Sequence, residues 1–244
     1  MAFMPTWVSR HVTYFKSRTM KTRISNHLFL LFLLTLGLTL SSCSKDKDEP
    51  IPDEVAGQIP GLGEAEGEPQ GAPFTLPDGV RLESDILGES CDTTLSRGSG
   101  YYVTVCVGLV NETNEDITLV LPAGLVLTAQ DKDYQSGMLL QGTTIVLRKK
   151  AVTRCTLFTF CANNHRSSSS RNCVYTLGPV TNSRLVGELI GLLQGKRINA
   201  EDYGDDETGY MTTVSTVQSA LWSITDGYGL DEYYKMALTE IPNK

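Results

Sequence analysis

The chain has 244 residues and a net charge of −7, from 21 basic and 28 acidic side chains. Its first 43 residues hold five basic residues and no acidic one, so the remainder carries 16 basic against 28 acidic residues, a net charge of −12. An acidic surface of this kind argues against nucleic acid as a partner. Beyond the first 43 residues His165 is the only histidine, which excludes a metal site built from several histidines.

Residues 28–40 form an apolar run of 13 residues (LFLLFLLTLGLTL) that follows a basic stretch. The run is too short for a comfortable membrane span and has the length of the apolar region of a secretory signal peptide. Met20, followed by Lys21 and Arg23, would make a compact basic region and is a candidate for the true start. We therefore assign residues 1–43 to a signal peptide rather than to the folded protein.

The end of the apolar run, Leu40-Ser41-Ser42-Cys43, resembles the lipobox of bacterial lipoproteins. The resemblance implies that Cys43 carries lipid such as palmitate, becomes the mature N-terminus and anchors the protein to a membrane. Residues 45–49 (KDKDE) resemble the acidic surface-export signal of Bacteroidota lipoproteins, and Ser44 stands where an aspartate would favour retention in the inner membrane. The expected location is the outer membrane, at the cell surface, although the same charged residues would also solvate a tether.

Residues 44–73 contain two basic residues, eight acidic residues and five prolines, without apolar periodicity. Such a composition cannot bury enough apolar surface to offset the entropy of ordering the chain. We expect a disordered, acidic, proline-rich tether here, kept extended by charge repulsion and proline. The remaining residues, 74–244, are enough for a single globular domain with its own core.

The first part of this domain has the pattern of β-strands. Runs rich in aromatic and β-branched residues alternate with turn signals such as residues 111–116 and Gln141-Gly142. The predicted strands cover residues 101–111, 117–121, 125–128, 138–140, 143–147 and 152–161. Strands at this spacing predict an antiparallel β-sandwich or barrel.

The last third of the chain has the three- and four-residue apolar steps of helices. The first helix lies near Leu185 to Leu193, with Ser183 as its N-cap and Gly195 as its stop. Two more are predicted over residues 212–225 and 231–238. The predicted fold class is therefore α+β, a β-sandwich or barrel-like part followed by two or three C-terminal helices.

Five cysteines follow the signal peptide, and an exported protein meets an oxidising compartment in which disulfides form. An odd number leaves at least one thiol unpaired in a monomer. Cys155 and Cys161 lie on one predicted strand, about 20 Å apart at 3.3 Å per residue, which is beyond disulfide reach. The candidate bridges are Cys91 with Cys106 and Cys155 with Cys173, leaving Cys161 free, but spacing does not fix the connectivity.

Two short motifs stand at the predicted end of a strand and on a predicted helix: Phe160-Cys161-Ala162 and Val217-Gln218-Ser219-Ala220-Leu221-Trp222. Together they resemble the thioester domains of bacterial surface adhesins over residues 158–228. In that family an aromatic residue or leucine precedes a cysteine, and a glutamine stands in a hydrophobic-Gln-x-x-hydrophobic-hydrophobic pattern. The resemblance implies that Cys161 is the thiol and Gln218 the acyl donor of an internal thioester. Ala162 departs from the family, where a larger apolar residue is usual.

Those two residue types suit this chemistry for a physical reason. Attack of a thiolate on the glutamine carboxamide expels ammonia and leaves a buried acyl thioester, an electrophile for an amine or hydroxyl on a partner. We therefore expect a lipid-anchored binding or adhesion module, not an enzyme, that acts covalently through Cys161 and Gln218. The expected partner is a host-surface or envelope protein or a glycan.

Other interpretations stay open. Cys161 also fits a buried structural cysteine or half of a disulfide with Cys173, Gln218 a helix-surface amide and Trp222 a core anchor. A Cys-dependent envelope enzyme using Cys161 with His165 is the alternative function, and a non-covalent structural or accessory lipoprotein is another. We expect no catalytic residue, cofactor or metal ion. The acidic run formed by Asp202, Asp205, Asp206 and Glu207 lacks EF-hand spacing and fits a solvated loop.

Overall fold

The computed structural model describes residues 53–244, so Cys43 and the predicted signal peptide lie outside the described residues. The strands are β1 (Gly71–Pro73), β2 (Val80–Leu82), β3 (Ile86–Leu87), β4 (Ser96–Gly98), β5 (Val103–Asn111), β6 (Ile117–Leu121), β7 (Leu125–Ala129), β8 (Gly137–Met138), β9 (Thr143–Leu147), β10 (Ala151–Cys161) and β11 (Val174–Thr181). The helices are α2 (Arg184–Leu192), the short 3-10 helix η1 (Ala200–Asp202), α3 (Glu207–Thr225) and α4 (Glu232–Thr239).

The long strand β10 is the centre of the β part. It pairs with β5 over most of its length and with β8 at its end, both antiparallel. From β8 the antiparallel ladder continues through β7, β11 and β3 back to β5, so these strands close into a barrel-like ring. β2 and β4 extend the sheet from β5 and β10, and β6 pairs with β9 in a separate ribbon. The predicted α+β class, with the β part first, is confirmed.

The strand predictions succeed where a run of β-branched residues is unbroken. β6 and β9 have the predicted bounds, and β10 begins one residue earlier than predicted. β11 escaped prediction because Gly178 and Pro179 interrupt its pattern. The structure accommodates them at an irregularity of the ladder between Leu177 and Val180, where the register with β7 shifts.

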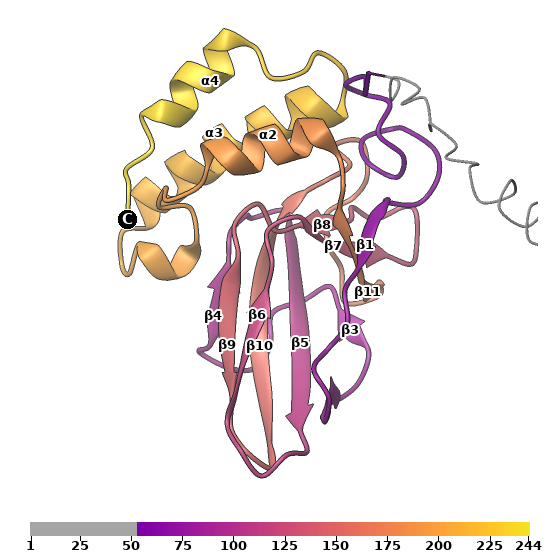
Figure 1. The fold of residues 1–244 in the computed structure, drawn as a ribbon, viewed down its shortest axis with the longest axis vertical. Coiled ribbons are helices and arrows are strands. Elements are labelled where there is room, and N and C mark those ends of the chain that lie inside the picture. The colour runs from indigo at the N-terminus through magenta and orange to yellow at the C-terminus, as the bar shows by residue number, and fades with distance from the viewer. Residues whose placement is uncertain (1–52) are drawn as a thin grey trace, which may run out of the picture. The chain divides into compact units, whose positions relative to one another are not determined.

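The three α-helices begin at side-chain caps. The Ser183 hydroxyl accepts a hydrogen bond of 3.1 Å from the Val186 N–H, as predicted for α2. α3 begins before the predicted Thr212 because the Asp206 carboxylate accepts a bond of 3.0 Å from the Gly209 N–H. The helices lie together over one end of the strands (Figure 1). Within residues 53–244, no helix combines the length and the apolar character needed to cross a membrane.

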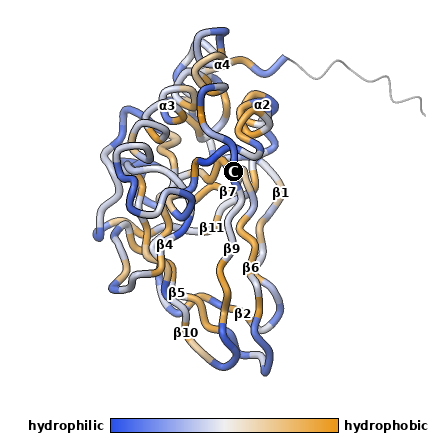
Figure 2. The backbone as a smooth tube through the Cα atoms, turned by 90° about the vertical axis from the view of Figure 1, so that its left-hand side faces the viewer, coloured by the Kyte–Doolittle hydropathy of each residue, from blue (hydrophilic) through white to orange (hydrophobic). Residues whose placement is uncertain are grey.

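Two apolar clusters hold these parts together. One fills the space between the strands, from Val105 and Leu109 on β5 to Leu157 on β10. The other joins the inner faces of the helices to the end of the barrel, with Phe160 and Leu221 among its members. Figure 2 shows the apolar residues following the strands, while hydrophilic residues mark the turns far from the helices. The end of β10 belongs to both clusters, since Cys161 lies in the first and Phe160 in the second.

Residues 53–73, predicted as part of the tether, pack on the domain instead. Leu62 is 1% exposed and joins the cluster under the helices. The Gly63 N–H donates to the Ala162 carbonyl at 2.7 Å, and the Asn163 side chain donates to the Gly63 carbonyl at 2.9 Å. Acidic residues dominate the composition of this segment, but two apolar residues, Ile59 and Leu62, anchor it to the domain. Its glycine-rich turn lies close to the end of α3, because a Cβ on Gly63 would meet the Thr225 backbone. Residues 44–52 lie outside the described residues.

One of the two predicted disulfide pairings is confirmed. Cys91 and Cys106 form a disulfide. Cys155 and Cys173 are free and buried, so the second predicted bridge is wrong. Cys155 lies on β10 and Cys173 directly precedes β11. These two strands are not neighbours in the sheet. The prediction that Cys155 and Cys161 share one strand is confirmed.

Candidate functional site

The fold brings Cys161 and Gln218 together from positions 57 residues apart. Cys161 is the last residue of β10, and Gln218 lies in the middle of α3. Cys161 is 0% exposed and Gln218 1%. The Cys161 N–H donates to Gln218 Oε1 at 2.8 Å, and Gln218 Nε2 donates to the Cys161 carbonyl at 2.9 Å. The sequence predicted this pair, and the structure joins it by two hydrogen bonds.

The Gln218 carboxamide takes the place of a neighbouring strand. Successive backbone groups of a strand face opposite edges, and the Ala162 N–H is bonded to the Ser136 carbonyl beside β8. The N–H and C=O of Cys161 therefore face the other edge, where the ladder with β5 ends two residues earlier, at Thr159 opposite Val103. Gln218 satisfies two backbone groups that would otherwise be buried without partners.

This arrangement also suits acyl chemistry. A hydrogen bond of 2.8 Å from the Cys161 N–H to Oε1 polarises the carboxamide carbonyl, as a donor in an oxyanion hole does. The second bond orients the amide nitrogen, which is the leaving group of thioester formation. The carboxamide carbon thus lies beside the residue that carries the thiol.

Trp222 stands one helical turn after Gln218, on the same side of α3. Its ring packs against the apolar cluster that contains Cys161 and lies 5.4 Å from the ring of Tyr102. Its indole Nε1 is buried and has no hydrogen-bond partner among residues 53–244. The prediction of Trp222 as a core anchor describes its ring, but the polar edge of the indole is unsatisfied.

Burial raises the pKa of the Cys161 thiol to about 11. The indole N–H of Trp222 and the backbone N–H of Asn163 act in the opposite direction, and Arg166 adds a smaller lowering effect. The Asp226 carboxylate raises the pKa further. The thiol is therefore protonated at neutral pH, and attack on the carboxamide requires that its proton be taken up as the reaction proceeds.

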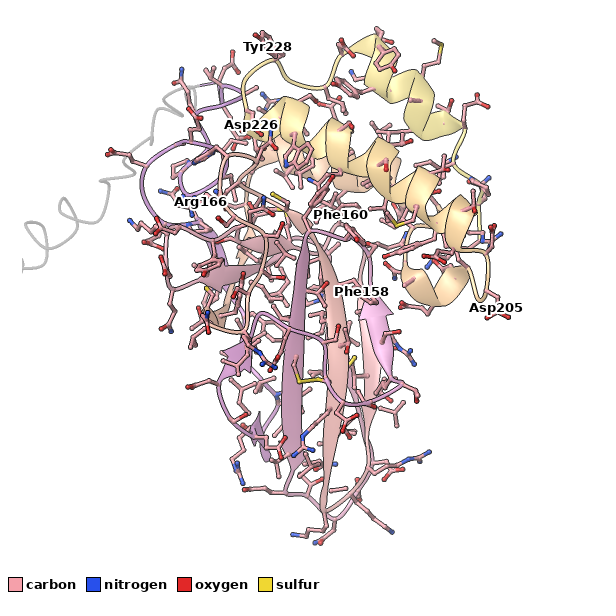
Figure 3. The ribbon with its side chains drawn as sticks, turned by 180° about the vertical axis from the view of Figure 1, so that it is seen from behind. Phe158, Phe160, Arg166, Asp205, Asp226 and Tyr228 are labelled. Atoms are coloured by element: carbon pink, nitrogen blue, oxygen red, sulfur yellow. A yellow bond between two sulfur atoms is a disulfide. The ribbon has the colours of Figure 1, made fainter. Side chains whose placement is uncertain are left out.

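His165, the sequence candidate for a base, interacts with acidic side chains. Its Nδ1 lies 3.9 Å from Glu64 Oε1, and it lowers the pKa of Asp226. Burial, the largest effect, raises the pKa of Asp226, which accepts a hydrogen bond of 2.9 Å from the Thr225 hydroxyl. Asp226, which sequence analysis did not single out, is the carboxylate that influences the Cys161 thiol. Figure 3 shows Asp226 beyond the end of α3, with Phe160 of β10 beneath the helix.

A surface cleft of about 380 Å³ borders Trp222 between the C-terminal part of α3 and the start of α4. Two carboxylates, three aromatic rings and two serines line it: Ser219, Trp222, Ser223, Asp226, Tyr228, Asp231 and Tyr234. Tyr228 is 98% exposed at its rim. Only Trp222 of these residues also packs against the cluster that holds Cys161.

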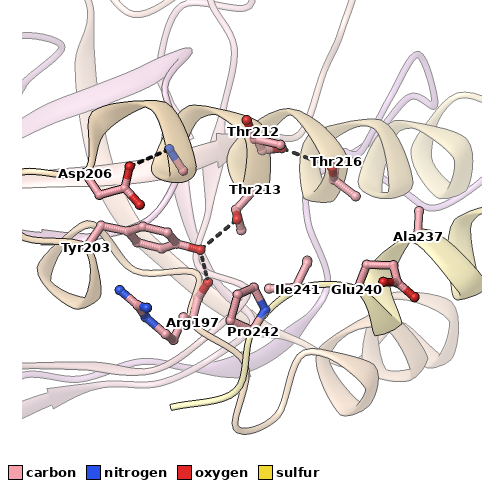
Figure 4. Close-up of a pocket in the computed structure, with 11 residues that line it drawn as sticks. Arg197, Tyr203, Asp206, Thr212, Thr213, Thr216, Ala237, Glu240, Ile241 and Pro242 are labelled. Carbon is pink, nitrogen blue, oxygen red and sulfur yellow. Dashed lines mark hydrogen bonds between the residues drawn. The ribbon is translucent and has the colours of Figure 1, made fainter.

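A separate cavity of about 310 Å³ lies between the start of α3 and residues 240–242 (Figure 4). Within it the Tyr203 hydroxyl donates to the Arg197 carbonyl at 2.6 Å and lies 2.7 Å from the Thr213 hydroxyl. Neither Cys161 nor Gln218 lines it. In the part of the chain that the structure describes, no group of three His, Cys, Asp or Glu side chains could hold a metal ion.

Comparison of the chain with protein-family models, with curated proteins and with solved structures finds no match. The thioester interpretation therefore depends on the two motifs and on the geometry of Cys161, Gln218 and Trp222.

Proposed function

We propose that this protein is a binding or adhesion module that stores a thioester between Cys161 and Gln218 and uses it to attach covalently to a partner. The observation that carries the proposal is the pair of hydrogen bonds, 2.8 and 2.9 Å long, between the Gln218 carboxamide and the backbone of Cys161. They hold the acyl donor against the residue that bears the thiol, in a site closed to solvent.

Thioester formation is balanced without a cofactor. The Cys161 sulfur attacks the Gln218 carboxamide carbon, a C–S bond forms and the C–N bond breaks. The amide nitrogen leaves as ammonia after taking the proton that the thiol gives up. The Cys161 N–H stabilises the charge that develops on Oε1 during attack, because it already donates to that atom.

The stored bond is then used once. An amine on the partner attacks the thioester carbon, the new C–N bond forms and the C–S bond breaks. The proton lost by the amine returns to the sulfur, which ends as the Cys161 thiol. A hydroxyl nucleophile would give an ester by the same steps. Burial protects the thioester from water until a partner engages the protein.

The proposed module is located at the cell surface. Cys43 carries a lipid that anchors the chain at the outer membrane, with the head at the cell surface and a host-surface or envelope protein or glycan as its partner. Cys43→Ser should leave the protein in the aqueous phase of a detergent partition, whereas the unaltered protein should enter the detergent phase. Equal partition of the two proteins would contradict the anchor.

The experiment that tests the reaction is capture of a tagged primary amine. The purified protein is incubated with fluorescent cadaverine, denatured and mapped by mass spectrometry of its peptides. We expect one tag per chain, on the side chain of Gln218, and none in Cys161→Ala. Ser215→Ala, a change at an exposed residue on the same helix, is the matched control and should be tagged as the unaltered protein is. A tag that survives in Cys161→Ala, or no tag at all, would overturn the proposal.

A further inference from the structure

The indole N–H of Trp222, beside the candidate site, is buried and has no hydrogen-bond partner among residues 53–244. A buried donor without an acceptor costs about 1–3 kcal/mol, so native structures retain few of them without a reason. Trp222 Nε1 is such a donor within residues 53–244. Phenylalanine would fill much of the same space without this cost.

The position of Trp222 on α3 brings its ring to the cluster that contains Cys161. Trp222 and Gln218 are one turn apart, so both side chains reach toward the end of β10. Gln218 engages the backbone of Cys161, and Trp222 packs against the cluster to which the Cys161 side chain belongs. The indole N–H acts on the pKa of the Cys161 thiol, which it lowers against the effect of burial.

We infer that the indole N–H of Trp222 is the donor that stabilises the sulfur of Cys161 when the thioester is opened. This inference rests on the proposed thioester. As the amine attacks, the C–S bond breaks and the bonding electrons remain on sulfur until a proton arrives. The Cys161 N–H serves the carbonyl oxygen, and the Trp222 N–H serves the departing sulfur, so the two donors act on different atoms of the same group.

The burial of the sulfur makes a donor beside it effective. Cys161 is 0% exposed, so water does not solvate a charge that develops there. The Asp226 carboxylate opposes negative charge on the same sulfur. Trp222 also lines the cleft of about 380 Å³, so the indole contacts both this cleft and the cluster that contains Cys161.

The test is the rate at which methylamine opens the thioester in the full-length protein. In Trp222→Phe, which keeps an aromatic ring but lacks the N–H, we expect the rate constant to fall about 100-fold, the usual effect of removing one such donor. The rate constant is measured on the fraction that carries the thioester, so a lower yield of thioester does not affect it. An unchanged rate constant would overturn the inference.

Two further variants separate chemistry from packing. Replacement of Trp222 by 3-benzothienylalanine keeps the shape of indole and replaces its N–H by sulfur, and it should slow the reaction as phenylalanine does even if Trp222→Phe fails to fold. Tyr102→Leu removes the ring packed 5.4 Å from Trp222 but keeps the N–H, and it should not slow the reaction. A slow reaction in Tyr102→Leu with a normal rate in the benzothienylalanine protein would assign Trp222 to packing alone. If the unaltered protein carries no thioester, the proposed function itself has failed, and that result is seen before any variant is compared.

Discussion

The carboxamide of Gln218 lies against Cys161 as an additional strand would, with bonds of 2.8 and 2.9 Å to the N–H and C=O of the same residue. Two roles are compatible with this relationship. A purely structural glutamine would complete the ladder at the end of β10. A reactive glutamine would do the same and then exchange its amide nitrogen for the neighbouring sulfur. Experiments on Gln218 must therefore separate stability from chemistry.

Gln218→Glu is expected to abolish the thioester, because no ammonia can leave from a carboxylate. It should also destabilise the fold by about 1–3 kcal/mol, since the Cys161 carbonyl loses its donor in a buried site. Intact mass measures the loss of the thioester, and urea unfolding measures the loss of stability.

Cys161→Ala is the control for this comparison. It removes the thiol but keeps both backbone bonds to Gln218, so it should lose the thioester at a smaller cost in stability. A Gln218→Glu protein that still incorporates methylamine at position 218 would contradict the assignment of Gln218 as the acyl donor.

The sequence predicted Cys161 and Gln218 because each stands in a short motif with a chemical meaning. It could not predict the hydrogen bonds between them, which depend on where the β5 ladder stops beside β10. Asp226 escaped notice for the same reason, since only the folded chain places its carboxylate near the thiol. The roles of Trp222 and Tyr102 likewise follow from the pairing of helix α3 with the barrel end.

Removal of the disulfide should destabilise the domain. Cys91 and Cys106 are 15 residues apart, and closing a loop of that length contributes about 3 kcal/mol through the unfolded state. The double variant Cys91→Ala/Cys106→Ala should therefore unfold at lower urea concentration than the oxidised protein. The protein reduced with a phosphine should match the double variant. Equal stability of oxidised and reduced protein would show that these two cysteines are not bridged.

The free thiol of Cys155 predicts a loss of stability at high pH. Burial raises its pKa to about 12 in the folded state, above its ordinary value of 9.0. Below that ordinary value both states hold the proton and the contribution is constant. Above it the unfolded chain ionises first, so stability falls by up to about 1.4 kcal/mol per pH unit until the folded thiol titrates.

Urea unfolding of the unaltered protein and of Cys155→Ala at two pH values measures this effect. The stability advantage of the unaltered protein should shrink by about 1.4 kcal/mol between neutral pH and about pH 10. Other buried groups, such as Tyr210, titrate in both proteins and cancel in the difference. An advantage that does not change with pH would mean that the Cys155 thiol is accessible to solvent.

The segment before β1 is predicted to stabilise the domain. Leu62→Ala should cost about 2–5 kcal/mol, because Leu62 is 1% exposed beneath the helices. Val55→Ala, at a position that is 52% exposed, is the matched control and should change stability little. Thermal unfolding compares the two. If both variants unfold at the same temperature as the unaltered protein, residues 53–70 do not pack on the domain in solution.

The tether prediction failed at Leu62 for a physical reason. Composition averaged over residues 44–73 reports the many acidic and proline residues, whereas packing depends on single apolar side chains at the right place. β11 was missed for a related reason, because Gly178 and Pro179 stop a strand pattern unless an irregular ladder accommodates them. The fold class and three helices were predictable, since unbroken apolar periodicity determines them.

The most direct test of the central claim is the difference in intact mass between the unaltered protein and Cys161→Ala. Both chains are processed alike and keep the Cys91–Cys106 bridge, so anchor and disulfide cancel in the difference. After correction for the substituted atoms, we expect the unaltered protein to be lighter by one ammonia and to gain one methylamine on incubation with that amine. A difference that equals the substituted atoms alone would contradict the thioester and leave Gln218 as a structural side chain that completes the β10 ladder.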